Sequence, residues 1–328
     1  MVVVVVTVDG VVTAVFPAHE ASRSAAIAAR DFIGGRVPAA PNGTGSVPPM
    51  PGLLSFHAHP DDESIAMGGT LAELADRGVA VSVVTATRGE AGEIHNRDDA
   101  DTVRHRLGEI REAEQHAALA VLGVTDLDYL GYRDSGMMGT PENSHPESFW
   151  NADYMEATGR LVALIRKYRP EVMTAYDPFG GYGHPDHIQV HRVGTAAFFG
   201  AADLGRFPRT QFGEPWQPDH LLWSSWSRER SIGVRRAMRG ETDEELEQEL
   251  DEPASGFLSQ FLSVRRDVSP FLDRKRRAML CHDTQFANDS WIRAMPKELI
   301  SGFLGEEVFV RVWGDSAVGD PLGVLRGK

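Results

Sequence analysis

The sequence predicts an α/β fold in which helices cover both faces of a mostly parallel sheet. From residue 53 onward, short apolar runs of strand length alternate with longer segments of helical spacing, an order typical of parallel sheets. Two of these runs lead into the same polar pattern, His-Pro-Asp, at residues 59–61 and 184–186. In open α/β sheets, ligands bind at the carboxyl ends of the strands. The predicted architecture is therefore Rossmann-like, with the active site at that edge.

The first 50 residues form a zone of different composition. Two valine-rich runs at residues 2–8 and 11–16 are joined by Asp-Gly, which predicts a β-hairpin. Residues 21–32 predict a helix. Residues 36–51 are rich in Pro, Gly and Ala, a composition typical of a linker.

The predicted division of the chain is an N-terminal extension with its linker, residues 1–50, and one large domain, residues 51–328. The extension offers no set of side chains suited to chemistry. Two interpretations of it stay open: a β-hairpin appendage, or a start placed too far upstream, with Met50 as the true initiator.

The elements of the large domain follow one another in βα order. A buried strand begins at Leu53, ends at a histidine and leads into a helical pattern. Further strands are predicted at residues 79–87, 127–130 and 172–176, and helices at 104–122, with Gly123 as its cap, at 154–168 and at 188–199.

The part after residue 203 is harder to interpret. Trp216, Trp223 and Trp226 are predicted to be core or pocket-wall residues. Residues 241–252 carry eight carboxylates, which is typical of a solvated helix or loop.

The segment that follows the first strand carries potential metal ligands. His59, Asp61 and Asp62 stand at its end, and Pro60 and Asp61 suit the first turn of a helix. Imidazole and carboxylate form an ordinary zinc ligand set, and a catalytic site needs three protein ligands and one open position. A third ligand is therefore expected from elsewhere in the chain.

The segment that follows the strand at 172–176 repeats this arrangement. A glycine-rich turn leads into His-Pro-Asp-His at residues 184–187, which opens a helix. A single His-Pro-Asp is most often only a helix cap. Two of them at two strand ends can converge on one ion, and this favours a metal site.

Composition excludes several classes of protein. The formal net charge of −14 over 328 residues argues against a nucleic-acid partner. No apolar run reaches the about 18 residues of a membrane span, so no membrane partner is expected. The single cysteine, Cys281, excludes an intramolecular disulfide and fits a cytoplasmic location. The sequence lacks both the G-x-G-x-x-G of dinucleotide binding after its first strand and the G-x-S-x-G of serine hydrolases.

Residues 58–63 (Ala-His-Pro-Asp-Asp-Glu) and 183–187 (Gly-His-Pro-Asp-His) resemble the paired motifs of the PIG-L/LmbE-like zinc deacetylases. Within that family the chain is similar to the mycothiol branch, which holds an N-acetylglucosaminyl-inositol deacetylase and a mycothiol S-conjugate amidase. The resemblance runs from about residue 53 to 203. It implies removal of an acetyl group from a small amino-sugar substrate of the N-acetylglucosamine type, with one Zn²⁺ per chain, or Fe²⁺ in the cell.

The resemblance also implies roles for individual residues. His59, Asp62 and His187 match the metal ligands, and Asp61 matches the general base that takes a proton from the attacking water. The other matching residues are His184, which stabilises the oxyanion or protonates the leaving amine, Asp186, which orients a histidine, Tyr182, which bonds the tetrahedral intermediate, and Arg111 and Asp134, which contact the substrate. His282 lies in a segment similar to a C-terminal family motif and is a candidate for a supporting position.

The choice of substrate rests on a few positions. Gly183 and residues 134–137 resemble the deacetylase, and residues 64–66 lack the lysine of the amidase. Residues 104–123 and 213–216 look more like the amidase. Deacetylation is therefore predicted, with the amidase or an antibiotic-pathway deacetylase as the alternative.

The sequence disfavours two other classes of protein. A metal-binding protein without turnover would lack the base, which is present here as Asp61. A zinc phosphoesterase usually needs two metal ions, and the sequence offers ligands for one.

Overall fold

The computed structural model describes residues 4–8, 11–15, 52–239, 256–294 and 297–327. The chain divides into two compact units, residues 1–48 and 49–328. In the first unit, β1 (Val4–Val8) pairs antiparallel with β2 (Val11–Val15), which confirms the predicted hairpin strands. The helix predicted at residues 21–32 lies outside the described residues.

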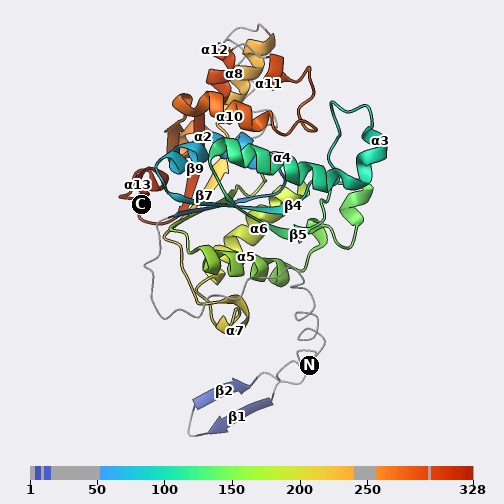
Figure 1. Ribbon diagram of the computed structural model, residues 1–328. Helices are drawn as coiled ribbons and strands as arrows, with labels where there is room; N and C mark the ends of the chain where they lie inside the picture. The colour runs from blue at the N-terminus through green and yellow to red at the C-terminus, as the bar shows by residue number, and fades with distance from the viewer. Residues whose placement is uncertain (1–3, 9–10, 16–51, 240–255, 295–296, 328) are drawn as a thin grey trace. The chain divides into compact units, whose positions relative to one another are not determined.

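The second unit contains a seven-stranded sheet with the order β5-β4-β3-β6-β7-β9-β8 (Figure 1). The first five strands in this order are parallel, β9 is antiparallel to β7, and β8 is antiparallel to β9. The mostly parallel sheet is therefore confirmed. The strands are β3 (Gly52–His57), β4 (Ala80–Thr87), β5 (Asp126–Tyr132), β6 (Val172–Tyr176), β7 (His220–Ser225), β8 (Val264–Asp267) and β9 (Glu306–Trp313).

The central strand β3 pairs with β4 on one side and with β6 on the other. The chain builds outward from β3 through β4 to β5, then returns across the sheet to place β6 directly beside β3, with Leu53 opposite Val172. This reversal is a topological switch point, where open α/β sheets bind their ligands. The two segments with His-Pro-Asp follow these two neighbouring strands.

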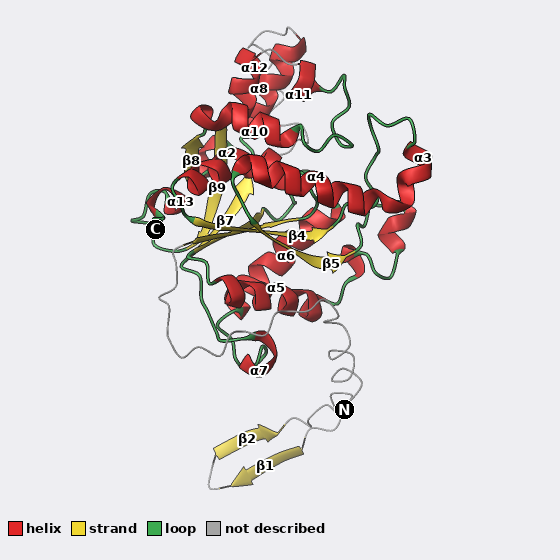
Figure 2. Ribbon diagram, viewed as in Figure 1, coloured by secondary structure: helices red, strands yellow, loops and turns green. Residues whose placement is uncertain are grey.

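Helices cover both faces of the sheet (Figure 2). The helices α2 (Asp62–Asp76), α4 (Leu107–Leu122) and α10 (Leu272–Met279) lie on one face, and α5 (Tyr154–Tyr168) and α6 (Pro185–Gly200) lie on the other. Because successive strand residues point to opposite faces, Leu53 joins the core under α2 and α4. Leu54 and Phe56 point to the opposite face, and both side chains join the core under α5 and α6.

The other helices and several 3₁₀ turns connect these elements. They are α3 (Ala100–Val103), α7 (Arg209–Phe212), α8 (Arg228–Arg239), α11 (Trp291–Ala294), α12 (Lys297–Leu304) and α13 (Pro321–Val324), with 3₁₀ turns η1 (Arg104–Arg106), η2 (Pro141–Ser144), η3 (Phe149–Asn151), η5 (Ser259–Phe261) and η6 (Ser269–Phe271). Across the described ranges, none of the helices has the length and apolar character needed to cross a membrane.

The structure corrects some predicted boundaries. The helix predicted from residue 104 begins at Leu107, because residues 104–106 form a 3₁₀ turn. It ends as expected at Gly123, whose φ of 83° is left-handed. The strands β7, β8 and β9 were not predicted. The acidic segment 241–252 lies outside the described residues.

Gly68 and Gly69 allow α2 to pack closely against Lys275 and Val268. A side chain built at Gly69 would bring Cβ to within 2.4 Å of the Cβ of Val268. The same stretch of α2 is held by Glu307 of β9, which accepts hydrogen bonds from the N–H groups of Gly69 and Thr70, both at 2.8 Å. Lys275 of α10 pairs with Glu307 at 2.7 Å, and both side chains are 1% exposed. Close packing and this buried pair therefore fix the helix whose first turn carries the site.

We expect Gly69→Ala to lower the free energy of unfolding by about 1–3 kcal/mol, because the added methyl group overpacks the contact with Val268. The matched control is Gly302→Ala on α12, where a Cβ meets nothing within 4 Å. That change should stabilise by about 0.5–1 kcal/mol, since alanine suits a helix better than glycine. Chemical denaturation of both variants measures the difference, and equal effects would contradict the packing argument.

Candidate metal centre and active site

A cavity of about 590 Å³ opens at the carboxyl ends of the parallel strands. Every site residue predicted from the sequence lines it except Asp186, which is fully buried beside it. The lining residues among those predicted are His59, Asp61, Asp62, Arg111, Asp134, Tyr182, His184 and His187. The pairing of β3 with β6 therefore brings the two distant motifs to one pocket.

His59 follows β3, and carboxylates surround its ring. Its Nε2 lies 3.2 Å from Asp186 Oδ2 and 3.5 Å from Asp134 Oδ1. A carboxylate on one ring nitrogen fixes the proton there and leaves the other nitrogen free to bind a metal. That other atom, Nδ1, lies 3.6 Å from Asp62 Oδ2. Burial alone lowers the pKa of His59, but Asp134, Asp186 and Asp62 outweigh it and raise the pKa well above its usual value.

His187 lies in the first turn of α6 and presents an unpaired nitrogen to the same place. Its Nδ1 lies 3.1 Å from the carbonyl oxygen of Gly180. Its buried Nε2 has no hydrogen-bond partner within the described part of the chain and lies 3.4 Å from Asp62 Oδ2. Burial lowers the pKa of His187, which favours the neutral ring that a metal requires. An unpaired buried nitrogen of this kind fits a metal ligand.

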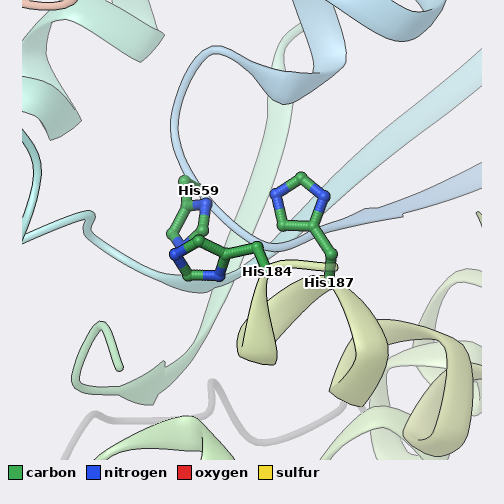
Figure 3. A group of neighbouring side chains, drawn as sticks. All are labelled: His59, His184 and His187. Carbon is green, nitrogen blue, oxygen red and sulfur yellow. The ribbon is translucent and has the colours of Figure 1, made fainter. Parts of the chain in front are cut away.

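The described residues contain two groups of three side chains that could hold a metal ion. Within each group, every residue offers one ligand atom, and these atoms lie within 4.8 Å of one another. The two groups are His59, His184 and His187 (Figure 3), and His59, Asp134 and Asp186. In the second group the carboxylates already have partners, since Asp134 accepts from the N–H of Gly136 and Asp186 from the N–H of Ser135. The unpaired nitrogen of this cluster, His187 Nε2, lies on the His59 Nδ1 side, where Asp62 Oδ2 is within 3.6 Å of both His59 and His187.

The residues present fit a zinc ion. Two imidazole nitrogens and one carboxylate oxygen are a ligand set of catalytic zinc sites, which keep a further position open. His59, Asp62 and His187 supply this set, and His184 lies beside it with its ring 4.6 Å from that of His59.

The structure corrects the predicted start of α2. The helix begins at Asp62, and Asp61 is its N-cap with φ 118° and ψ −32° rather than a first-turn residue. A non-glycine residue in such a conformation costs about 1–3 kcal/mol. The consequence is that two consecutive carboxylates face different partners: Asp61 Oδ2 lies 3.2 Å from Arg111 Nη2, and Asp62 faces the two histidines.

The pKa values of these two carboxylates move in opposite directions. Burial raises the pKa of Asp61 to about 6, although the nearby Arg111 opposes the shift. Burial also acts on Asp62, but His187 and His59 outweigh it and hold its pKa well below the usual range. Such a separation is typical of one carboxyl group used as a base and another used as a permanent anion.

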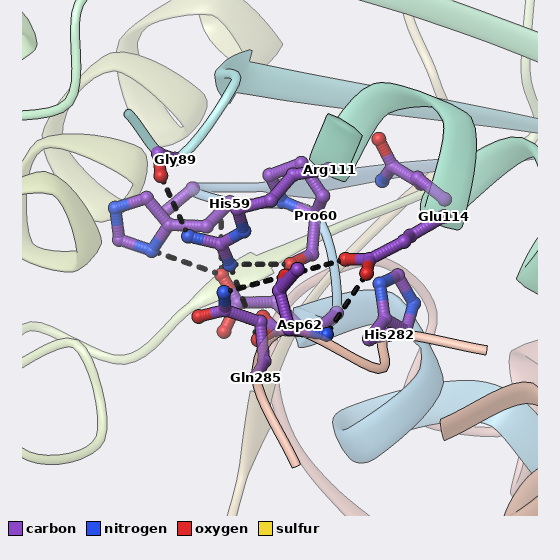
Figure 4. A network of polar contacts seen from close by, with 12 residues as sticks. His59, Pro60, Asp62, Gly89, Arg111, Glu114, His282 and Gln285 are labelled. Atoms are coloured by element: carbon purple, nitrogen blue, oxygen red, sulfur yellow. Dashed lines mark hydrogen bonds and ion pairs between the residues drawn. The ribbon is translucent and has the colours of Figure 1, made fainter. Parts of the chain in front are cut away.

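Arg111 comes from α4 and is 3% exposed. Its Nη1 donates to the carbonyl oxygen of Gly89 at 2.9 Å and its Nη2 to that of Pro60 at 2.7 Å (Figure 4). The arginine predicted to contact substrate thus lines the pocket, but most of its N–H groups already donate hydrogen bonds within the protein. Asp134 is held in a similar way, with the N–H of Ala91 on its second oxygen at 3.2 Å.

His184 and Tyr182 lie on the turn that leads into α6. His184 is the N-cap of that helix, and its Nδ1 accepts a hydrogen bond from the N–H of Asp186 at 3.1 Å. Burial and the neighbouring histidines lower the pKa of His184 to about 3. The neutral ring therefore carries its proton on Nε2. Tyr182 is 52% exposed, and its ring lies 4.8 Å from that of His187.

Two supporting residues had no predicted role. Glu63 is fully buried and accepts hydrogen bonds from Gln115 Nε2 at 2.9 Å and His282 Nε2 at 3.2 Å. His282, a candidate for a supporting position, thus contacts the carboxylate of Glu63. Tyr176, the last residue of β6, has its hydroxyl 3.0 Å from His57 Nδ1 and its ring 4.8 Å from that of His187. Both are inconspicuous in sequence, because one follows two carboxylates and the other ends an apolar strand.

Trp216, Trp223 and Trp226 behave as core or wall residues. Trp226 lines the pocket. Trp216 donates its ring N–H to the carbonyl oxygen of Pro170 at 2.7 Å, and Trp223 lies on β7 with its ring against His191.

The family model described as PIG-L: GlcNAc-PI de-N-acetylase matches residues 54–198. A protein of Nocardioides sp. named 1D-myo-inositol 2-acetamido-2-deoxy-alpha-D-glucopyranoside deacetylase is 41% identical over 282 residues, which cover 78% of this chain and 90% of that protein. A protein of the same name from Thermobifida fusca is 43% identical over 245 residues, which cover 72% and 83%.

Solved structures show the same fold. The N,N'-diacetylchitobiose deacetylase of Pyrococcus horikoshii superposes with a TM-score of 0.57 at 23% identity, over 80% of this chain and 84% of that one. At this identity the similarity concerns the fold alone. The curated relatives are far more similar in sequence and are matched over most of their length. From their identity and coverage together with the family model, the chain belongs to the PIG-L family of de-N-acetylases.

Proposed function

We propose that this protein is a zinc-dependent N-deacetylase that removes the acetyl group from a 2-acetamido-2-deoxyglucoside of inositol. The observation that carries the proposal is the convergence of His59, Asp62 and His187 beside Asp61 in one cavity. Relatives that are 41% and 40% identical bear the name of this activity.

In this mechanism His59, Asp62 and His187 would hold one divalent ion, zinc or in the cell Fe²⁺. When bound, such an ion lowers the pKa of water and polarises the amide carbonyl. Asp61 takes a proton from the water that attacks the acetamide carbon, and Arg111 keeps the Asp61 carboxylate in place.

The remaining steps use His184 and Tyr182. As the new C–O bond forms, charge develops on the carbonyl oxygen, and the Nε2–H of His184 and the Tyr182 hydroxyl donate hydrogen bonds to it. The C–N bond then breaks, acetate leaves, and the amine of the sugar receives the proton that Asp61 took from the attacking water. Asp186 keeps the ring of His59 oriented throughout, at 3.2 Å from its Nε2.

Recognition of the sugar is assigned to Asp134 and Arg111, which offer an acceptor and donors at the pocket wall. Gly183 supports the deacetylase over the amidase, in which proline stands at this position. Its φ of 92° is out of reach of proline, so this residue also sets the shape of the turn that carries Tyr182. The net charge of −14 fits a small uncharged substrate rather than nucleic acid. A cytoplasmic location is part of the proposal, since the one cysteine needs no oxidising compartment.

We expect His187→Ala to lose its metal, because it removes the unpaired nitrogen that faces Asp62. The wild-type protein should contain about one zinc per chain, measured by mass spectrometry of the dialysed protein. His191→Ala is the matched control, because His191 lies one turn further along α6 and bonds only the backbone oxygen of Tyr176. Full metal content in His187→Ala would refute the assignment.

Asp61→Asn should keep about one zinc per chain and lose kcat by about 10²–10⁴-fold, the range typical of a missing general base. The amide retains the size of the side chain and can still accept a hydrogen bond from Arg111. Metal content and kcat are measured on the same sample. If the zinc is lost with the activity, the roles of Asp61 and Asp62 must be exchanged.

The substrate assignment predicts a higher kcat/KM for N-acetylglucosaminyl-inositol than for a mycothiol S-conjugate. It also predicts discrimination against simple acetamides, because these lack the sugar hydroxyls that Asp134 and Arg111 are assigned to bind at the pocket wall. Mass detection of the released products measures all three. A preference for the S-conjugate would replace the deacetylase by the amidase.

A further inference from the structure

The peptide bond between Pro60 and Asp61 is held at both of its polar ends by buried charged side chains. Arg111 Nη2 donates to the carbonyl oxygen of Pro60 at 2.7 Å, as Figure 4 shows. On the opposite end, the N–H of Asp61 donates to Glu63 Oε2 at 3.2 Å. Arg111 is 3% exposed and Glu63 is not exposed at all. A cation and an anion thus grip one peptide group from opposite ends.

This grip acts where the backbone is strained. With φ 118°, Asp61 occupies a region that glycine visits easily and other residues avoid. Such a conformation persists only when the surroundings over-determine it. The next residue is fixed independently, because Asp62 Oδ2 accepts a hydrogen bond from the N–H of His59 at 2.9 Å. The Pro60–Asp61 peptide is therefore the element whose rotation would redirect the Asp61 carboxylate.

Glu63 is itself oriented by donors from three parts of the chain. They are Gln115 Nε2 of α4 at 2.9 Å, His282 Nε2 at 3.2 Å and the neighbouring Ser64 Oγ at 2.7 Å. Gln115 is in turn held by Thr85 of β4 at 2.9 Å and by the hydroxyl of Tyr129 of β5. A buried carboxylate is tolerated only when it is hydrogen-bonded, and this one has a full set of partners anchored on two strands, one helix and the C-terminal part of the domain.

We propose that Glu63 is a positioning residue for the reaction. Together with Arg111 it holds the Pro60–Asp61 peptide in its strained conformation, and this aims the Asp61 carboxylate into the pocket while Asp62 faces the histidines. The inference rests on the proposed role of Asp61 as the base. It adds a residue that touches neither substrate nor metal.

The same helix provides a matched control. Glu307 is also a buried carboxylate that accepts hydrogen bonds from two N–H groups of α2, those of Gly69 and Thr70, and it also has a buried partner, Lys275. Glu307 belongs to β9, and its contact with α2 lies about two turns further along the helix than Glu63. If Glu63 served only to stabilise α2, Glu63→Gln and Glu307→Gln would have the same consequences.

The experiment compares Glu63→Gln with Glu307→Gln in the full chain, with N-acetylglucosaminyl-inositol as substrate. Both variants should lower the midpoint of thermal unfolding. Glu63→Gln should in addition lower kcat by about 10²-fold, the cost of misplacing a catalytic group by about 1 Å, with KM within about twofold and about one zinc per chain retained. Glu307→Gln should keep the wild-type kcat. In a crystal structure of Glu63→Gln, Asp61 should leave the positive-φ region.

A wild-type kcat in folded Glu63→Gln, or loss of zinc in step with activity, would overturn the proposal. If Glu63→Gln does not fold, His282→Leu removes one donor to Glu63 from outside the pocket. It should reduce kcat by about tenfold with KM unchanged, since it weakens the support of the same group, and an unchanged kcat overturns the proposal. The crystallographic φ of Asp61 is a readout independent of activity. It therefore separates failure of this inference from failure of the base assignment, which Asp61→Asn tests.

Discussion

The pairing of β3 with β6 is the constraint on which the rest of the site depends. These strands are far apart in sequence, yet Leu53, Leu54 and Ser55 lie in register with Val172, Met173 and Thr174. A shift of one residue would turn every side chain of a strand to the opposite face of the sheet, and it would separate His59 from His187. The apolar contacts of the two cores therefore do more than stabilise the domain. They set the distances between donor atoms that come from two different loops.

The second constraint is electrostatic. Several histidines and carboxylates lie together at low exposure, and each carboxylate has a compensating partner: Asp186 and Asp134 face His59, Asp61 faces Arg111, and Asp62 faces His187. Burying a charge is costly unless it is paired. After these pairings, His187 Nε2 is left without a hydrogen-bond partner among the described residues. This unpaired nitrogen favours the His187 side of the cluster for the proposed metal site, whereas proximity alone also groups Asp134 and Asp186 with His59.

The fold and the two His-Pro-Asp segments could be predicted because their signals are local, whereas Arg111, Asp134 and Tyr182 were expected only from the resemblance to a family. Apolar strand runs, Gly123 as a cap and two copies of His-Pro-Asp need only a few neighbouring residues to be recognised. The positive φ of Asp61 could not be predicted, because it depends on Arg111 and Glu63, and Glu63 depends on His282, distant in sequence. The strand β8 was missed for another reason: its four residues include two arginines and an aspartate, and only pairing with β9 makes them a strand.

The residues proposed for catalysis and the residues of the outer pocket wall come from different parts of the fold. The proposed ligand and base residues lie between the end of β3 and the start of α2, and at the start of α6, which are tied to the sheet and to buried polar networks. The outer wall comes from the loops after β4, β5 and β7, with Glu93, Glu142 and Trp226, and from Gln285 near the C-terminus. These parts support one another, since Gln285 donates to the carbonyl oxygen of Glu93 at 3.0 Å. Loops carried on a rigid scaffold can change without disturbing it. We therefore expect the acceptor sugar to be selected by the part of the pocket that the paired motifs do not reach, and this explains why those motifs indicate amide hydrolysis more strongly than they indicate the substrate.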